Sequence, residues 1–373
     1  MCIRDRFTMF SAVKFVAASA TVALLGGFLL AGLLTAPQGD EVLPAAVSAS
    51  PTVEATSEPN EAETTSVRTD ILPGVALTVE EVAPGMHLVL GDGIRQLSGP
   101  IHDVAIDGED QVWVELGSSR NWRIVRLGEA GVSRRLGRKD PWDLDVTPDG
   151  RPTVHSPSAH LVYDGKAWVK SKQTEGEPAA RPSRCPKEHQ FLAGGECWSV
   201  GWPFGGLSRD VGGEEQLMPN AQFGLADDEM AWGNLSTGDG TGWVFVFADE
   251  RMSKFDGLLR YDRDGWTLIP FEPPASLGGE VAVQPFPEWY AFAPDGTLWL
   301  SGWARSASAD SEAFEWLGFA AISWDGEAWA AYGPADGEGD GASGVHVARD
   351  GSPWILHGGH LFAITPGAVA AAE

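Results

Sequence analysis

Residues 105–114 have the sequence AIDGEDQVWV and residues 291–300 have the sequence AFAPDGTLWL, and the two segments align position for position without a gap. Four further segments fit the same frame: 145–154 (DVTPDGRPTV), 190–199 (QFLAGGECWS), 235–244 (LSTGDGTGWV) and 346–355 (HVARDGSPWI). One position of each segment, the anchor, is held in chain order by Trp113, Thr153, Trp198, Trp243, Trp299 and Trp354, at spacings of 40, 45, 45, 56 and 55 residues. A repeat of this period indicates a propeller or a solenoid.

Each segment predicts a β-hairpin, because Asp-Gly tolerates a positive φ at the turn and the apolar residues around the anchor suit a packed strand. A second signal follows later in three of the units, at 163–168 (YDGKAW), 261–266 (YDRDGW) and 324–329 (WDGEAW). Two hairpins per unit give four strands, which is one propeller blade. The sequence therefore predicts an all-β, six-bladed β-propeller over residues 71–373.

The two ends of such a ring should meet in one blade, because only a closed ring leaves no open sheet edge. After Trp354 the chain has room only for a strand at 361–364, and residues 88–97 resemble the later hairpin of a blade. We therefore expect the N-terminal hairpin to complete the last blade. Seven blades are the alternative, if residues 75–90 form a blade of their own or the insertion between Asp262 and Trp289 contains one.

The repeat resembles that of bacterial propellers of the two-component-regulator type, which pair an Asp-Gly hairpin ending in Trp with a later aromatic-Asp-Gly-x-x-Trp. The resemblance covers residues 85–365. The chain departs from that type at Thr153, at the third segment, which lacks Asp, and in having no kinase, receiver or effector sequence after the repeats. The resemblance therefore implies a fold and leaves the function open.

The composition excludes two classes of protein. With 26 Lys and Arg against 52 Asp and Glu, the formal net charge is −26, which argues against a nucleic-acid partner. The 16 Trp, the 16 Phe and the 43% of hydrophobic residues exclude a wholly disordered chain.

The N-terminal region predicts the location of the protein. Residues 15–36 are apolar and uncharged, long enough to cross a bilayer as a helix. Lys14 precedes this segment and Asp40 follows it, so the positive-inside rule places residues 1–14 in the cytoplasm and the propeller outside, with the membrane as a partner through this helix. A cleaved signal peptide is the alternative, although its apolar core would be shorter. Residues 1–6 (MCIRDR) resemble a translated sequencing adapter, an artefact that would make Met9 the start.

Residues 37–70 predict a disordered acidic linker, because they contain no aromatic residue and one basic residue, Arg68. Cys185 and Cys197 are the two cysteines of the exported part, and an oxidising environment favours a disulfide between them over two free thiols.

Candidate ligand-binding residues come from the position of each repeat in the ring. In propellers of this kind, by resemblance, ligands bind where loops enter the innermost strands around the central channel. The positions eleven and ten residues before the anchors supply the candidates His102, Asp103, Trp142, Asp143, Glu188, Trp232, Glu288 and Trp289. Carboxylates beside indoles suit a carbohydrate, a cation or an extended peptide. The alternative is that these residues only pack blades and form turns.

No motif predicts a cofactor or a metal. Residues 336–341 (DGEGDG) resemble the opening of a calcium loop, but Val347 holds the twelfth position, where a bidentate Glu is needed. The pair His357 and His360 lacks further ligands nearby in the sequence, and no nucleophile elbow or nucleotide loop is present.

Function is thus expected to be non-catalytic: a membrane-tethered, extracytoplasmic binding or sensing module for a protein or envelope ligand. The alternative is a lactonase-like or lyase-like propeller enzyme, in which Asp103, Asp143, Glu188 and Glu288 hold a metal or act as acid and base. A third interpretation is an inert spacer.

Overall fold

The computed structural model divides the chain into two compact units, Met1–Glu63 and Thr64–Glu373. It describes residues 66–72, 74–117, 122–128, 133–135, 143–156, 159–171, 185, 190–200, 206–236, 241–248, 252, 254–262, 265–277, 281–306, 315–335 and 343–368, all in the second unit. The predicted membrane helix at 15–36 lies outside the described residues. Among the residues that are described, no helix is long and apolar enough to cross a bilayer.

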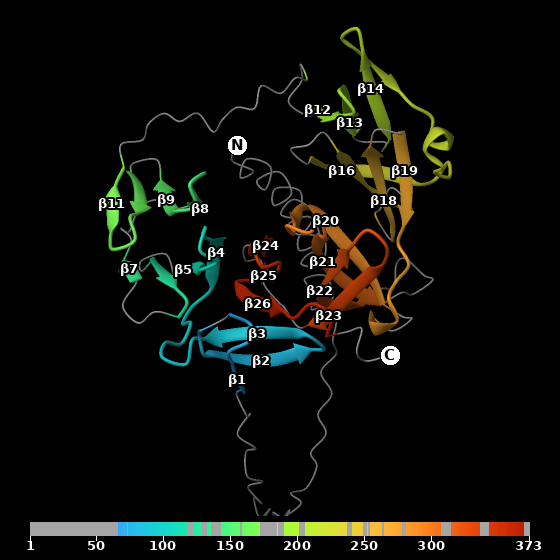
Figure 1. Ribbon diagram of the computed structural model, residues 1–373. Coiled ribbons are helices and arrows are strands. Elements are labelled where there is room, and N and C mark those ends of the chain that lie inside the picture. Colours follow the sequence, from blue (N-terminus) through green and yellow to red (C-terminus); the bar gives the residue numbers. More distant parts are fainter. Residues whose placement is uncertain are drawn as a thin grey trace, which may run out of the picture. The chain divides into compact units, whose positions relative to one another are not determined.

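The described residues form antiparallel β-sheets, joined by turns and two short 3₁₀ helices, η1 (Asn220–Phe223) and η2 (Ala275–Leu277) (Figure 1). This confirms the predicted all-β class. Five of the sheets have four strands in chain order, and each is built from consecutive hairpins.

The first two of these sheets use the segments around Trp113 and Thr153. The strands of the first sheet are β4 (Ile101–Ile106), β5 (Val112–Leu116), β6 (Arg123–Arg126) and β7 (Ser133–Arg135). Those of the second are β8 (Asp143–Val146), β9 (Pro152–Ser156), β10 (Ala159–Tyr163) and β11 (Trp168–Lys170).

The next three sheets follow the same plan. Their strands are β12 (Gln190–Ala193), β13 (Glu196–Val200), β14 (Leu207–Val211) and β15 (Glu214–Leu217); β16 (Met230–Ser236), β17 (Gly242–Phe247), β18 (Phe255–Asp262) and β19 (Gly265–Pro270); and β20 (Val281–Phe292), β21 (Leu298–Ser306), β22 (Trp316–Trp324) and β23 (Trp329–Ala335).

The sixth sheet joins the two ends of the unit. Its strands are β1 (Ser66–Arg68), β2 (Leu77–Ala83), β3 (Met86–Gly91), β24 (Gly344–Val347), β25 (Pro353–His357) and β26 (His360–Ile364), in the order β1-β2-β3-β26-β25-β24. Leu88 of β3 is paired with Phe362 of β26. This confirms that an N-terminal hairpin completes the last sheet, and it makes the topology propeller-like.

Two details of that sheet differ from the prediction. The closing hairpin is β2–β3 rather than residues 88–97, because the chain turns after β3, where the Asp92 carboxylate accepts the N–H groups of Ile94 (3.1 Å) and Arg95 (2.6 Å). Strand β1 lies in the last residues of the predicted linker. Arg68, the one basic residue of that stretch, forms an ion pair with Asp70, and its Nη1 lies 3.2 Å from Nε2 of His87, which fixes it against the sheet.

In five sheets the anchor residue lies in the second strand, as the repeat predicts, and in the sixth sheet Trp354 lies in β25, the second strand from the β24 edge. Each anchor is paired with a residue of the strand before it: Ala105 with Trp113, Asp145 with Thr153, Phe191 with Trp198, Leu235 with Trp243, Ala291 with Trp299, and His346 with Trp354. The alignment of the sequence segments is therefore an alignment of hairpins in the same register.

The two repeated sequence signals meet at the junctions between sheets. The ring of Trp113 lies 4.9 Å from Tyr163 and 5.5 Å from Trp168, which flank the turn between β10 and β11 of the next sheet. Trp198 packs in the same way, 5.9 Å from Tyr261 and 5.2 Å from Trp266. We call this an aromatic junction: an anchor Trp on one sheet against the aromatic pair of the following sheet.

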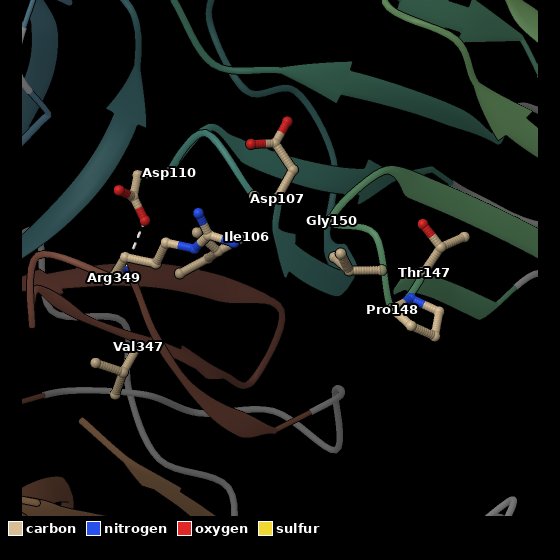
Figure 2. A pocket seen from close by; sticks show the side chains of 10 residues that line it. Ile106, Asp107, Asp110, Thr147, Pro148, Gly150, Val347 and Arg349 are labelled. Atoms are coloured by element: carbon tan, nitrogen blue, oxygen red, sulfur yellow. Dashed lines mark hydrogen bonds between the residues drawn. The ribbon is translucent and has the colours of Figure 1, made fainter. Parts of the chain in front are cut away.

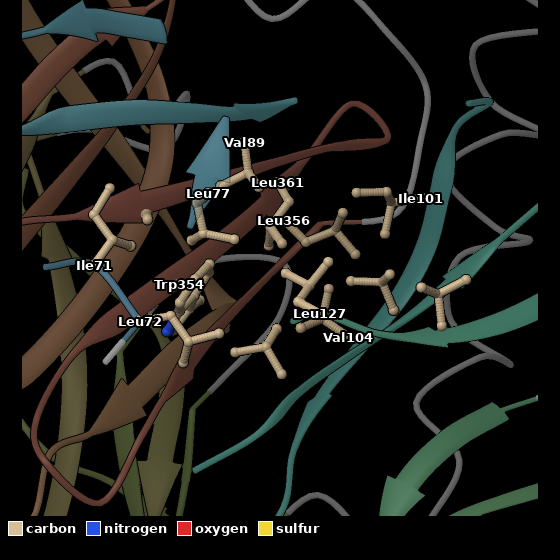
Figure 3. Packing of buried hydrophobic residues seen from close by; sticks show 14 of the residues in the cluster. Ile71, Leu72, Leu77, Val89, Ile101, Val104, Leu127, Trp354, Leu356 and Leu361 are labelled. Carbon is tan, nitrogen blue, oxygen red and sulfur yellow. The ribbon is translucent and has the colours of Figure 1, made fainter. Parts of the chain in front are cut away.

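The junction between the sixth sheet and β4–β7 is filled by aliphatic residues around the anchor (Figure 3). Trp354 is 1% exposed and shares a cluster with Val104 and Leu127 of β4–β7, and with Leu72 and Leu361. The chain after β6 carries Leu127 and Gly128 where other sheets carry an aromatic residue and Asp, and branched aliphatic side chains occupy the space.

One junction lacks both halves of the aromatic contact. Thr153 replaces Trp on β9, and the strands β14 and β15 carry Asp210 and Glu215, paired with one another, where an aromatic pair would stand. Each of the other five pairs of neighbouring sheets is linked by strands in extensive contact. Among the described residues, no strand of β8–β11 makes such a contact with a strand of β12–β15. We call it the third junction, because it leads from β8–β11 into β12–β15, the third four-stranded sheet in the chain.

Candidate functional site

The structure describes several of the predicted ligand-binding residues, and those at the start of β4 make contacts within the fold. Nε2 of His102 lies 2.9 Å from the carbonyl oxygen of Gly117, and its ring lies 4.3 Å from Trp122. The Asp103 carboxylate accepts the N–H of Val104 (2.9 Å) and, from the next sheet, the N–H of Leu144 (3.0 Å). Asp103 therefore ties the first strands of two sheets together.

The predicted indoles pack against other rings. Trp232 on β16 lies 6.3 Å from Phe247 of its own sheet. Trp289 on β20 is 9% exposed and lies 4.4 Å from Phe286 and 5.8 Å from His357.

Three candidates remain without a described side chain. Trp142 and Glu188 lie outside the described residues, and Glu288 lies in β20 with a side chain outside them. The convergence of Asp103, Asp143, Glu188 and Glu288 therefore stays a prediction, as does the predicted set of ligand-binding residues as a whole.

A cavity of about 220 Å³ lies at the opposite ends of β4, β8 and β24, where the chain leaves these strands (Figure 2). Three hairpin turns surround it and bond to one another. The N–H of Arg349 donates to Oδ1 of Asp110 (2.6 Å), and the N–H of Gly108 donates to the carbonyl of Gly150 (2.7 Å). A Cβ on Gly108 would lie 3.0 Å from the Cα of Gly150, so the turns need glycine to approach this closely.

This cavity offers little chemistry. Asp107 lines it, but its carboxylate accepts the N–H groups of Glu109 (2.8 Å) and Gln111 (3.0 Å) and the indole N–H of Trp113 (2.8 Å). Both carboxylate oxygens of Asp107 are therefore used in hydrogen bonds that stabilise the hairpin. The sequence prediction missed the cavity because it considered only the loops that enter the first strands; the Asp-Gly turns themselves were the available signal.

The second sheet presents a polar face. Leu144, Val154 and Leu161 pack with Trp113 and so face β4–β7. Because side chains alternate along a strand, the residues between them point the other way. They form the polar face of β8–β11: Asp143, Asp145, Thr153, His155 and His160.

Three of these residues lie in one row across the sheet. Asp143 is paired with His155, and His155 with His160, in the registers of β8–β9 and β9–β10. Nε2 of His155 lies 3.4 Å from Oδ2 of Asp143, with side-chain exposures of 36% and 33%. The ring centres of His155 and His160 are 6.5 Å apart.

Thr153 contacts His160 across the two strands. Its hydroxyl lies 2.9 Å from the carbonyl oxygen of Leu161 and 2.7 Å from Nε2 of His160. Nδ1 of His160 is buried and has no hydrogen-bond partner within the described part of the chain. Burial, with a smaller contribution from His155, lowers the pKa of His160.

The sheet on the other side of the third junction also has a polar face, directed away from Trp198 and its cluster. There the Gln190 amide donates to Asp210 (3.3 Å) and Glu215 (3.4 Å), and the hydroxyls of Ser199 and Ser208 are 3.0 Å apart. Cys197 lies on the same face and forms the predicted disulfide with Cys185, at a Cα–Cα distance of 5.3 Å.

Within the part of the chain that the structure describes, no group of three or more His, Cys, Asp or Glu side chains is placed to hold a metal ion. The calcium-loop candidate at 336–341 lies outside that part. His357 is 1% exposed, with its ring 4.5 Å from Phe319 and 4.8 Å from Trp303, so it packs among aromatic rings, whereas His360 is exposed.

No protein-family model and no curated protein matches the sequence. Three solved structures are similar to the chain at low identity. A streptogramin B lyase is 10% identical, with a TM-score of 0.35, over 72% of this chain and 94% of that one. The extracellular domain of BT4673 from B. thetaiotaomicron, described as a one-component system, is 10% identical, with a TM-score of 0.26, over 71% and 38%. The gluconolactonase XC5397 from Xanthomonas campestris is 13% identical, with a TM-score of 0.24, over 76% and 91%. Likenesses at this level leave ligand and activity open.

Proposed function

We propose that the chain is a membrane-tethered, extracytoplasmic six-bladed propeller of the two-component-regulator type that binds an envelope ligand without catalysis. Residues 15–36 would anchor it, and the ligand would contact the polar side chains that flank the third junction. The excess of acidic residues in the chain suits a partner that is not anionic.

The observation that carries this proposal is the missing aromatic junction. The junctions around Trp113 and Trp198 are closed by large rings, and that around Trp354 by a buried aliphatic cluster. At the third junction the same positions hold Thr153 on one sheet and polar residues on the other. The third junction therefore departs from the packing around Trp113 and Trp198, and departures from a local rule are expected at functional sites.

The contacts of Asp103 bear on the alternative, a lactonase-like or lyase-like enzyme. Its carboxylate accepts two backbone N–H groups, one of them from a neighbouring sheet. A general acid or base must exchange a proton with a substrate, and a carboxylate held in this way serves the framework better than proton transfer. This argues against Asp103 as a catalytic acid or base.

Membrane fractions of cells that express the full chain would test the proposal. We expect the chain to stay with the membrane after an alkaline wash and to be accessible to protease added from outside. Chemical cross-linking should capture one envelope component, and Asp145→Lys together with Glu215→Lys, both at exposed residues, should abolish capture by placing cations on both polar faces. Glu327→Lys, on an exposed turn elsewhere, is the matched control. Equal capture by the double variant and the control would refute binding at this junction.

A further inference from the structure

The sheet β20–β23 is extended at the end where the chain enters it (Figure 1). Its first strand, β20, has 12 residues, whereas the strands β4, β8, β12, β16 and β24 have four to seven. Residues 281–285 pair with 302–306 ahead of the bulge at 286–289. A Cβ on Gly302 would collide with the carbonyl oxygen of Gln284, so glycine is needed where the extension begins. The sequence predicts ligand binding at this end of the repeats.

Four aromatic rings run from the core to the surface of this extension. Phe319 is fully buried, and its ring centre lies 4.5 Å from that of His357, which is buried too. The ring of His357 lies 4.8 Å from Trp303, and Trp303 lies 5.6 Å from Trp316. We call these four residues the aromatic column. Each ring packs on the one beneath it, so the fold orients Trp316 at the outer end.

Trp316 presents an apolar ring to solvent. It is 52% exposed, more than any other tryptophan that the structure describes. The other exposed large apolar side chains of the described residues lie on or beside other sheets: Val67, Ile94, Val169, Val211 and Leu217. A protein partner would need a contiguous apolar patch with a polar rim. The described part of this surface offers one indole instead, which is enough for one small ring.

The surroundings of Trp316 favour a sugar over a cation. The ring centres of Trp303 and Trp316 are 5.6 Å apart, so the two indoles touch and leave no cage between them for a cation. Polar groups close the same end of the hairpin, where the N–H of Glu315 donates to Oγ of Ser306 (2.9 Å) and the Glu315 side chain is exposed. A pyranose ring has a face of C–H groups that stacks on an indole, and hydroxyls at its edge that bond to such polar groups.

We propose that the outer end of the aromatic column is a glycan-binding site, where one neutral pyranose ring of an oligosaccharide or polysaccharide stacks on Trp316. The net charge of −26 disfavours acidic sugar chains. Because Trp303 and His357 already hold the indole in position, little side-chain ordering is needed on binding. The site lies on β21 and β22, apart from the third junction, and does not rest on the proposed function.

Titration of the full chain with three neutral hexasaccharides, cellohexaose, maltohexaose and chitohexaose, tests the site. The detergent should carry neither a sugar nor a choline headgroup. Isothermal titration should detect saturable binding of at least one hexasaccharide. Trp316→Ala should weaken that binding about tenfold, and Trp316→Phe should weaken it less, because a smaller ring keeps part of the stacking surface. Leu217→Ala, at another exposed apolar residue, is the matched control and should bind as the parent does.

Oxidation of indoles by N-bromosuccinimide, mapped by mass spectrometry of peptides, locates the contact. The bound hexasaccharide should slow oxidation of Trp316 in the parent chain. No saturable binding of any of the three sugars overturns the proposal, and so does equal affinity of the parent and Trp316→Ala. Protection of Trp316 by choline and by none of the sugars would reject a glycan in favour of a cation.

The variant Asp145→Lys with Glu215→Lys separates this site from the proposed function. It changes only the third junction, so it should bind the hexasaccharide as the parent does even where it no longer captures an envelope component. Loss of sugar binding in this variant, with binding kept in Trp316→Ala, would place the glycan at the third junction and reject the site on the aromatic column.

Discussion

The aspartates of the repeated turns share one role. Each accepts a backbone N–H two residues further on: Asp164 from Lys166, Asp295 from Thr297, Asp325 from Glu327 and Asp350 from Ser352, at 2.8–2.9 Å. This contact is an Asx turn, in which the side chain replaces a backbone acceptor. The same bonds lower the pKa of Asp164, Asp295 and Asp325. Much of the acidity of the repeats thus serves the turns.

Asp325→Ala should lower the free energy of unfolding at pH 7 by about 1 kcal/mol, because two backbone N–H groups, those of Glu327 and Ala328, lose their acceptor. The pKa of Asp325 is lower in the folded than in the unfolded chain, so this stability is present above the ordinary value of 3.8 and is lost as the pH falls below it. Urea unfolding at several pH values measures the difference. Glu327→Ala is the control, and an equal loss in both variants would contradict the turn as the cause.

His346 makes a second acid-sensitive contribution to stability. Burial lowers its pKa from 6.5 to about 4, while the charge of Asp145 opposes the shift. The unfolded chain therefore takes up this proton first, and stability that is complete above pH 6.5 is lost as the pH falls to about 4. Alanine occupies the equivalent position of two other sheets, at Ala105 and Ala291. His346→Ala should fold and should flatten the pH dependence of unfolding over that interval, and an unchanged slope would show that other groups cause it.

At the level of the element, the sequence predicted what is local. Asp-Gly turns and apolar residues around each anchor predict hairpins, and the structure places Trp113 and its equivalents in the second strand of each repeated hairpin pair, β25 being second from the β24 edge. The contact between Trp113 and Tyr163 was not predictable from these patterns, because the periodicity shows that both signals recur without showing that they touch across two sheets. For the same reason the replacement by Thr153 was visible as a departure, while the contacts of Thr153 with His160 and Leu161 were not.

Trp113→Ala should lower the free energy of unfolding by about 3–5 kcal/mol, because the side chain is fully buried and its loss leaves a cavity beside Tyr163 and Trp168. Thr153→Ala, at the equivalent anchor, should cost only about 1 kcal/mol through its hydrogen bonds. Equilibrium unfolding in urea compares the two. Equal losses would mean that the aromatic junction does not carry the packing energy assigned to it.

For the whole folded unit, the pairing of its two ends in one sheet was predictable and the cavity was not. An unpaired sheet edge at either end of the unit would be unfavourable, so the two ends are expected to pair. The pairing of β3 with β26 confirms this expectation. The cavity forms where Asp110, Gly150 and Arg349 meet, from turns as far as 239 residues apart in the sequence. Such a meeting follows from the angles between sheets, which no local pattern encodes.

The disulfide closes a short loop, because Cys185 and Cys197 are separated by 12 residues. Cys197→Ser should lower the free energy of unfolding by about 3 kcal/mol in the chain-entropy model. Cys185→Ser and the double variant should lose the same amount, since either change opens the loop. Treatment of the parent chain with a reductant should reproduce the loss, and an additive loss in the double variant would show that burial of Cys185, not the bond, carries the effect.

The closing pair of strands makes the two ends of the folded unit depend on one another. Leu88 lies on β3 opposite Phe362 of β26, in the interior of the six-stranded sheet. Leu88→Pro removes an N–H and forces the ring of proline into this sheet, which should cost about 3 kcal/mol or more. Hydrogen exchange should then show β2–β3 and β24–β26 losing protection together, because each needs the other as its neighbour. Leu217→Pro, at the exposed outer strand β15, is the control and should leave both ends protected, since edge strands tolerate proline. If β24–β26 kept its protection in Leu88→Pro, the C-terminal hairpins would be stable without the N-terminal strands, and the ring would not be held by this pairing.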